Sequence, residues 1–401
     1  MKQEENVMSV LLKQAEAMAD EIIAIRRDIH RHPELGQELP RTSQLVTDKL
    51  KEFGVDEVLH PVSTAVIGVI HGNKGPGKCV GLRCDMDALP LKEETGLPFS
   101  SVNEGRMHAC GHDLHTAMML GNAKLLCQHR EEFAGTVKLI FEPSEEVQPG
   151  GARMIVASGD VDDVDVFVGM HVRPSDGGAG KVALRKGPIT TSADEVHITV
   201  HGKSGHGSEP DKAADAILAG CQLNVLLQQI AARNINPLDT VILTVNQIDG
   251  GKAINIIAET CRLSGGFRTY TPEAREVGIR KIHDICRGVE AISGCKIDDQ
   301  VVIGYDACFN DEDTVDILAA AYADDLGEDS YYMMKEPVKF SEDFSFFSTQ
   351  TGKPSVLLFL DAGFAPGHEM GVLHSGSCTF DEAAIPHGIA AMCAGALRLL
   401  K

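Results

Sequence analysis

Apolar residues along this chain recur at two spacings, and segments of the two kinds alternate. Residues 8–31 carry apolar side chains at helical spacing, which predicts a helix that ends before Pro33, because proline restricts the residue in front of it. Continuous apolar runs at 79–85, 135–141 and 165–172 are typical of strands buried on both faces. Strands that alternate with helices in this way predict an α/β sheet covered by helices.

The pattern changes near residues 187–192. The next part of the chain is predicted to form a strand at 196–200, a helix at 213–230, strands at 240–246 and 259–268, a helix at 273–292 and a strand at 301–305. This order fits a small two-layer α+β domain. The chain then returns to the first pattern and ends on an apolar helix, 380–399. We therefore expect a mixed-sheet α/β domain, formed by 1–188 and 305–401, that is interrupted by a smaller α+β domain at 189–304.

The composition argues against several classes of protein. The 401 residues include 58 acidic and 37 basic side chains, a net charge of -21, which argues against nucleic acid or an anionic membrane as a partner. No apolar run approaches the roughly 20 residues of a membrane span, and the first residues lack the layout of a signal peptide. The 11 cysteines are scattered and form no CxxC pair, which favours a reduced, cytoplasmic protein.

Potential metal ligands are most concentrated at residues 107–116, MHACGHDLHT, directly before an apolar run. Five potential metal ligands fall within this stretch: His108, Cys110, His112, Asp113 and His115. Imidazole and thiolate are the ligands that zinc and its neighbours prefer. We therefore expect a metal site here that takes further ligands from elsewhere in the chain.

Polar residues also follow the buried strands. Asp85 and Asp87 end one strand, Glu145 and Glu146 follow the next, and His171 lies near the end of a third. Each has a structural alternative: a helix cap, an exposed acidic turn, or a satisfied core histidine. Because ligands of α/β sheets bind beyond the carboxyl ends of the strands, the repetition favours a site. One glutamate bound to a metal and one beside it would provide a ligand and a base.

Single polar residues elsewhere are weaker signals. His206 lies in a glycine-rich turn, GHGS, Asn255 follows the loop DGGKAIN, and Arg268 closes a strand in GGFRTY. Taken alone, each is expected to be an exposed loop or surface residue. His368 and His374 precede the last helix, where a histidine is placed like the earlier candidate ligands.

Nine segments in this order resemble the zinc-dependent aminoacylase and amidohydrolase family that includes hippurate hydrolases and auxin-conjugate hydrolases. Its wider relatives are metallopeptidases of the carboxypeptidase G and dipeptidase types. The segments extend from residue 29 to 382 and read IHRHPELGQE, LRCDMDALPL, MHACGHDLHT, FEPSEE, GMHV, GHGSEP, INIIAETCRLSGGFR, SEDFSFF and LHSGSCTFDE. Small departures, such as Cys84 in place of alanine, remove no ligand.

The resemblance implies a centre of two divalent metal ions per subunit, with zinc expected first and manganese, cobalt or nickel as alternatives. The implied ligands are Cys110, His112, Glu146, His171 and His374. It further implies that Glu145 is the general base and that Asp87 is a catalytic aspartate that supports the ligands without binding the metals. His108 and His115 are then expected to be structural or to support the ligands without binding the metals, and Asp113 is expected to cap the following helix.

The resemblance also assigns the inserted domain a lid and dimerisation role. His206 would reach the substrate carbonyl, often across the interface of a homodimer, while Asn255 and Arg268 would grip the substrate's carboxylate end. The implied activity is hydrolysis of N-acyl or N-aroyl amino acids. A dipeptidase or carboxypeptidase of the same chemistry is the first alternative, and a catalytically idle metal-binding relative is the second, against which the intact Glu145 argues.

Overall fold

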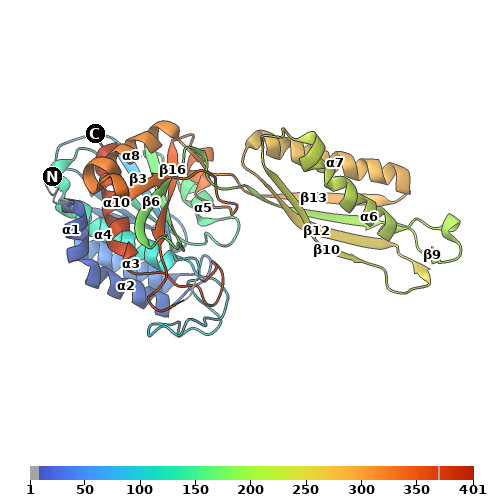
Figure 1. The fold of residues 1–401 in the computed structure, drawn as a ribbon, viewed down its shortest axis with the longest axis horizontal. Coiled ribbons are helices and arrows are strands. Elements are labelled where there is room, and N and C mark those ends of the chain that lie inside the picture. The colour runs from blue at the N-terminus through green and yellow to red at the C-terminus, as the bar shows by residue number, and fades with distance from the viewer. Residues whose placement is uncertain (1–8, 369–370) are drawn as a thin grey trace, which may run out of the picture. The chain divides into compact units, whose positions relative to one another are not determined.

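The computed structural model describes residues 9–368 and 371–401, and the chain divides into two compact units (Figure 1). The first unit comprises the described residues up to Gly187 together with those of Phe309–Pro337 and Asp343–Lys401. The second unit comprises Pro188–Cys308 and Val338–Glu342. The second unit is therefore an insertion in the sequence of the first, with a short later segment added to it.

An eight-stranded sheet forms the centre of the first unit, with the strands in the order β1-β2-β4-β3-β5-β16-β6-β15. Their bounds are β1 Glu57–Leu59, β2 Val66–His71, β3 Cys79–Asp85, β4 Thr136–Glu142, β5 Val166–Arg173, β6 Ala179–Leu184, β15 Tyr331–Met333 and β16 Ser355–Ala362. The strands β4, β3, β5 and β16 pair in parallel, whereas β1, β2 and β6 join antiparallel neighbours. The sheet is mixed, as the sequence predicted.

Helices cover both faces of this sheet: α4 and α10 lie on one side and α5 on the other (Figure 1). The helices of the unit are α1 Val10–Ala17, α2 Ala19–Arg31, α3 Pro40–Phe53, α4 His112–Gln128, α5 Gly151–Ser158, α8 Glu312–Leu326, α9 Ser345–Thr349 and α10 Ala384–Leu399. The prediction of a single helix over 8–31 is wrong in one respect, because the helix is interrupted at Met18, between α1 and α2. Met8 lies outside the described residues.

The parallel strands place the predicted site at one edge of the sheet. Every residue of β3 is buried, so the apolar run at 79–85 becomes a central strand with the predicted bounds. In the parallel register Asp85 lies opposite Glu142, the last residue of β4. The carboxyl ends of β3, β4 and β5 therefore open towards one edge, from which the loops that carry the candidate ligands start.

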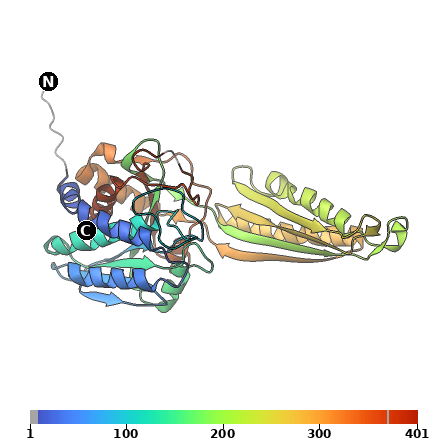
Figure 2. The ribbon, with the colours of Figure 1, turned by 90° about the horizontal axis from the view of Figure 1, so that it is seen from below.

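The second unit is a four-stranded antiparallel sheet, β10-β12-β8-β13, with two helices on one of its faces (Figure 2). Its elements are β8 Ala193–His201, β9 Gly205–His206, α6 Ala216–Leu227, β10 Val241–Gly250, β11 Ile256–Ile257, β12 Thr260–Thr269, α7 Pro272–Ser293 and β13 Lys296–Tyr305. Buried and exposed residues alternate in β8, because one face packs on the helices and the other faces solvent. The expected two-layer α+β insertion is confirmed.

Local signals fix the long helix of this unit. The Thr271 side chain accepts a hydrogen bond from the Ala274 N–H and caps α7, Pro272 occupies its first turn, and Gly294 ends it with a left-handed backbone. Among the described residues of both units, no helix combines the length and apolar character that crossing a membrane would require.

Candidate metal centre

The MHACGHDLHT stretch turns sharply into α4 at Gly111. Gly111 has a φ of 93°, and a Cβ atom there would lie 2.3 Å from a methyl carbon of Val172. Only glycine fits a left-handed position with so little room. The turn places Cys110 and His112 on either side of it, at the start of the helix and beside the end of β5.

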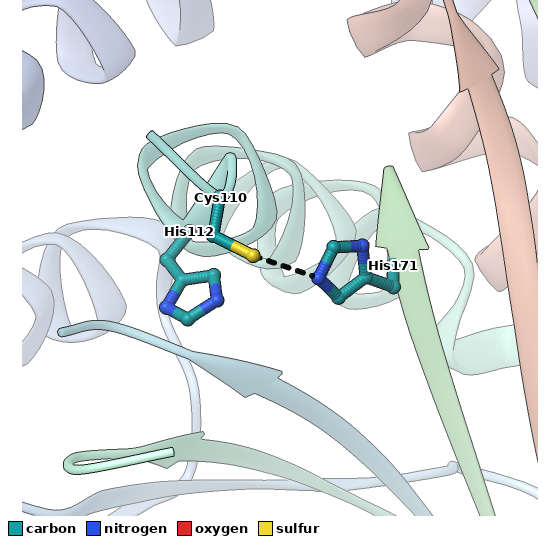
Figure 3. Close-up of side chains that lie close together, drawn as sticks. All are labelled: Cys110, His112 and His171. Atoms are coloured by element: carbon teal, nitrogen blue, oxygen red, sulfur yellow. Dashed lines mark hydrogen bonds between the residues drawn. The ribbon is translucent and has the colours of Figure 1, made fainter. Parts of the chain in front are cut away.

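Cys110 and His171 are in direct contact (Figure 3). The Cys110 Sγ lies 3.3 Å from Nε2 of His171. The other ring nitrogen of His171, Nδ1, donates to the Val172 carbonyl oxygen at 2.5 Å. Since a carbonyl can only accept, the proton of neutral His171 lies on Nδ1, and Nε2 presents its lone pair to the thiol side. Burial and the neighbouring His115 hold the pKa of His171 well below its usual value, so the ring is neutral.

His112 presents a nitrogen to the same space. Its Nδ1 donates to the main-chain oxygen of Asp87 at 2.8 Å. Its Nε2 is buried and has no hydrogen-bond partner among the described residues; it lies 3.8 Å from Oδ1 of Asp85 and 3.9 Å from Oε1 of Glu146. Burial opposes a charged ring, but the surrounding carboxylates, Asp85 first, raise the pKa of His112 to about 10. An environment that favours a proton on this nitrogen also favours a metal cation in its place.

Asp87 organises the two glutamates. Its Oδ1 accepts from the backbone N–H of Glu145 at 3.0 Å, and its Oδ2 accepts from that of Glu146 at 3.2 Å. Ser144, directly before them, has a φ of 66°. This tight turn brings both glutamates to one side, as the sequence suggested. Burial, reinforced by nearby carboxylates, raises the pKa of Asp87 despite its contact with His112.

Glu146 meets the last candidate ligand. Its Oε1 lies 3.2 Å from Nε2 of His374. Burial would raise the pKa of Glu146, but His374 and His112 lower it, so the carboxylate is ionised. The loop holds His374 through its backbone N–H, which donates to the Ala109 oxygen at 3.1 Å. About half of the His374 side chain is exposed, so this ligand lies at the open side of the cluster.

The five implied ligands and Glu145 therefore gather at one place. Three overlapping groups have their potential ligand atoms within 4.8 Å of one another: Cys110, His112 and His171; Cys110, Glu146 and His374; and His112, Glu145 and Glu146. Thiolate, imidazole and carboxylate together suit zinc and similar divalent ions. The buried, unpartnered nitrogen of His112 and the facing donor atoms fit such ions.

The remaining polar residues of the stretch have other tasks. Asp113 does not cap α4, contrary to expectation: Gly111 occupies the cap position. The Asp113 carboxylate instead accepts from Nε of Arg26 at 2.6 Å and lies 2.8 Å from Nδ1 of His30. His108 is buried with neither ring nitrogen hydrogen-bonded in the described structure, and burial lowers its pKa to about 3.

Of the three candidate residues of the second unit, His206 and Asn255 lie close together, and Arg268 lies apart from them. His206 in β9 pairs with Ile256 in β11, next to Asn255, and both candidates are exposed. The His206 Nδ1 accepts from the Ser208 N–H at 3.2 Å, which leaves Nε2 as the donor of a neutral ring. Arg268 lies near the far end of β12 and donates to the Ser341 hydroxyl at 3.3 Å.

Comparison with known proteins identifies the family. Residues 81–398 match the model of peptidase family M20/M25/M40. The chain belongs to this family. It is 38% identical over 291 residues to an N-acyl-L-amino acid amidohydrolase of Geobacillus stearothermophilus, covering 72% of this chain and 78% of that protein. It is 35% identical over 380 residues to the hippurate hydrolase of Campylobacter jejuni, covering 94% and 96%.

A solved structure agrees with the fold. A dinuclear metal-binding M20 peptidase of Bacillus subtilis superimposes with a TM-score of 0.84 at 29% identity, covering 96% of this chain and 99% of that one. The expected fold class and the resemblance to aminoacylases are confirmed. This M20 chain is thus a hydrolase that acts on amide bonds, and the candidate ligand groups lie in its α/β unit.

Proposed function

We propose that this protein hydrolyses the amide bond of N-acyl or N-aroyl amino acids at a centre of two divalent metal ions. The observation that carries the proposal is the arrangement of Glu145 and Glu146, whose backbone amides both bind Asp87. One carboxylate, Glu146, faces the imidazoles of His112 and His374. The other, Glu145, is buried beside the cluster. An idle relative would have no need to retain such a base.

Cys110, His112, Glu146, His171 and His374 would hold the ions. Bound there, divalent metal ions would polarise the scissile carbonyl and lower the pKa of a water molecule. Zinc is our first choice, with manganese, cobalt and nickel as alternatives, because the ligand set mixes thiolate, imidazole and carboxylate. Binding would displace the proton from His112 and require Cys110 as thiolate.

Glu145 is the proposed general base. It would take a proton from the attacking water and later transfer a proton to the leaving amine nitrogen. Asp87 supports this task because it fixes the backbone on both sides of the peptide between the two glutamates. The substrate would be a small N-acyl amino acid, the class of compound that the names of the two amidohydrolase relatives state.

The second unit is proposed as a lid and dimerisation domain. His206 would donate to the oxyanion that develops on the carbonyl, and Arg268 would pair with the substrate carboxylate, which Asn255 would also contact. Yet the step from Thr260 to Arg268 along β12 spans about 26 Å at roughly 3.3 Å per residue. His206 lies beyond the Thr260 end, where His201 pairs with Thr260. One lid cannot bring both ends of its sheet to one small substrate, which supports His206 and the neighbouring Asn255 acting from a second copy.

The surface of the second unit offers a matching dimer contact. Helix α6 exposes apolar side chains, with Leu218 57% and Val225 71% exposed. The neighbouring strand β10 is an edge of its sheet, so its free backbone groups can pair with another chain. We propose a homodimer through α6 and β10. None of the 11 cysteines, all of them within the described residues, forms a disulfide, which supports a reduced, cytoplasmic setting.

A substrate panel tests the proposal. Purified protein loaded with zinc, cobalt or manganese is assayed on hippurate, N-acetyl-amino acids and dipeptides. We expect turnover of the acylated amino acids to exceed that of the dipeptides. Preferred cleavage of dipeptides would instead favour the peptidase alternative, and no turnover on any substrate with two metals bound would contradict the enzyme proposal.

A further inference from the structure

A buried histidine outside the proposed ligand set joins three elements of the metal centre. His115 lies one helical turn after His112 on α4 and is 2% exposed. Its Nε2 accepts a hydrogen bond from the backbone N–H of Val172 at 2.8 Å. Its Nδ1 contacts Oδ1 of Asp85 at 2.5 Å. Because Nε2 accepts, the ring proton lies on Nδ1 and is donated to the Asp85 carboxylate.

The contact with Val172 takes the place of pairing that is missing on the β3 side of β5, whereas β16 pairs with Val172 on the other side. Strand β5 pairs with β3 only as far as Gly169, which lies opposite Arg83. Beyond that point β5 continues for several residues, and a buried backbone N–H needs a partner. His115 supplies one to Val172, the residue directly after the proposed ligand His171. Since the Val172 carbonyl also accepts from Nδ1 of His171, the orientation of the His171 ring depends on where this peptide is held.

A buried guanidinium fixes the other end of the contact. Arg83 donates to Oδ2 of Asp85 at 2.8 Å, to Glu142 at 2.7 Å and to Asp343 at 2.9 Å, and all four side chains are at most 1% exposed. The chain from Arg83 through Asp85 to His115 therefore connects the ends of β3 and β4 to the end of β5. The three buried ion pairs of Arg83 hold this network in place.

We propose that His115 is a positioning residue that orients His171 for metal binding and does not itself bind a metal. This role rests on the metal centre proposed above. Asp85, His112 and His115 lie close enough to form a metal group of their own. However, both nitrogens of His115 already make hydrogen bonds, one to a carboxylate and one to a backbone N–H, so neither presents a lone pair to an ion.

Zinc affinity of the chelator-treated protein, measured by competition with a chromophoric chelator, tests the role. His115→Phe keeps an aromatic ring but loses both hydrogen bonds. We therefore expect zinc to bind about 10–100-fold more weakly, the usual effect of removing a residue that orients a metal ligand. His115→Gln offers one donor and one acceptor and should recover part of the affinity. The control Met118→Leu changes a buried neighbour on the same helix and should bind zinc like the wild type.

The outcomes separate this role from the proposed function. Wild-type affinity in folded His115→Phe would overturn the positioning role even if the enzyme is active. A fall in the thermal stability of the metal-free protein without any change in zinc affinity would overturn it as well, because the residue would then be merely structural. Failure of the wild type to bind zinc would overturn the metal centre itself, whatever the variants do.

A measurement on the wild type covers the case in which His115→Phe does not fold. In the protein labelled with ¹⁵N-histidine and loaded with ¹¹³Cd²⁺, we expect cadmium coupling to Nε2 of His171. His115 should show no coupling and should keep its proton on Nδ1. Coupling between cadmium and either nitrogen of His115 would make it a ligand and overturn the proposal.

Discussion

The carboxylate of Asp87 accepts a hydrogen bond from the backbone N–H of Glu145 at 3.0 Å. The same carboxylate accepts from the next residue, Glu146, at 3.2 Å, and its main-chain oxygen accepts from His112. One residue thus fixes a proposed base and two proposed ligands. Because Asp87 is buried, at 1% exposed, solvent cannot take over its hydrogen bonds when the carboxylate is removed.

Replacing Asp87 tests this arrangement. Asp87→Asn keeps the size of the side chain but presents an amide donor to one of the two backbone N–H groups, which stays buried without a partner. We expect kcat/KM to fall about 10–100-fold, together with zinc affinity. Steady-state kinetics and zinc titration measure both. Asp48→Asn, on the exposed face of α3, serves as the control and should change neither quantity.

Substitution of Glu145 should lower turnover, whereas substitution of Glu146 should lower metal content. Glu145→Gln removes the proposed base, so we expect turnover to fall by about 10²–10⁴-fold while metal content stays near normal. Glu146→Gln removes a proposed ligand and should lower metal content. Elemental analysis of both dialysed proteins, beside their rates on hippurate, measures the difference. Loss of metal from Glu145→Gln with metal retained in Glu146→Gln would reverse the two roles.

The sequence predicted the strands and the cluster better than it predicted the supporting contacts. The run at 79–85 became β3 with the same bounds because an uninterrupted apolar segment has few alternatives to a central strand. The predicted capping role of Asp113 is wrong, because its partner Arg26 lies 87 residues away in the sequence and local spacing cannot reveal it. Likewise the carboxylates around Arg83 are 2, 59 and 260 residues distant. The break at Met18 has no local signal that we recognise.

The buried pair of His30 and Glu93 predicts a stability change in acid. The Glu93 carboxylate lies 3.2 Å from Nε2 of His30 and accepts from the Ser101 N–H at 2.6 Å. Burial opposes its ionisation, but these partners, His30 first, lower the pKa of Glu93 from 4.5 to about 2. A carboxyl group with a lower pKa in the folded state stabilises the fold above its unfolded pKa and loses that effect as the pH falls.

The free energy of unfolding of the wild type should therefore exceed that of Glu93→Gln most above pH 4.5, and the difference should shrink as the pH falls towards the lowered pKa. Urea unfolding of both metal-free proteins at several pH values measures it. Glu94→Gln, at the exposed neighbouring position, is the control and should show little difference at any pH. A Glu93→Gln difference that grows in acid would contradict the assignment.

Mixing two inactive variants tests whether His206 acts from a second copy. His206→Ala keeps its own Glu145, and Glu145→Gln keeps its own His206. In a mixed dimer, one of the two sites would have both groups. When equal amounts of the two variants exchange subunits after mild dissociation, about one quarter of all sites should therefore be active. Each variant mixed with itself is the control. Failure to regain activity, with mixed dimers present by native mass spectrometry, would contradict action across the dimer.

Titration of the metal-free enzyme with zinc, followed by the rate of hippurate hydrolysis, tests the central claim most directly. The cluster of Cys110, His112, Glu146, His171 and His374 beside Glu145 predicts that the rate rises from near zero and reaches its plateau once two equivalents are bound. Cobalt or manganese should replace zinc in the same stoichiometry. Full activity of the metal-free protein, or no activity after two equivalents have bound, would contradict a two-metal amidohydrolase.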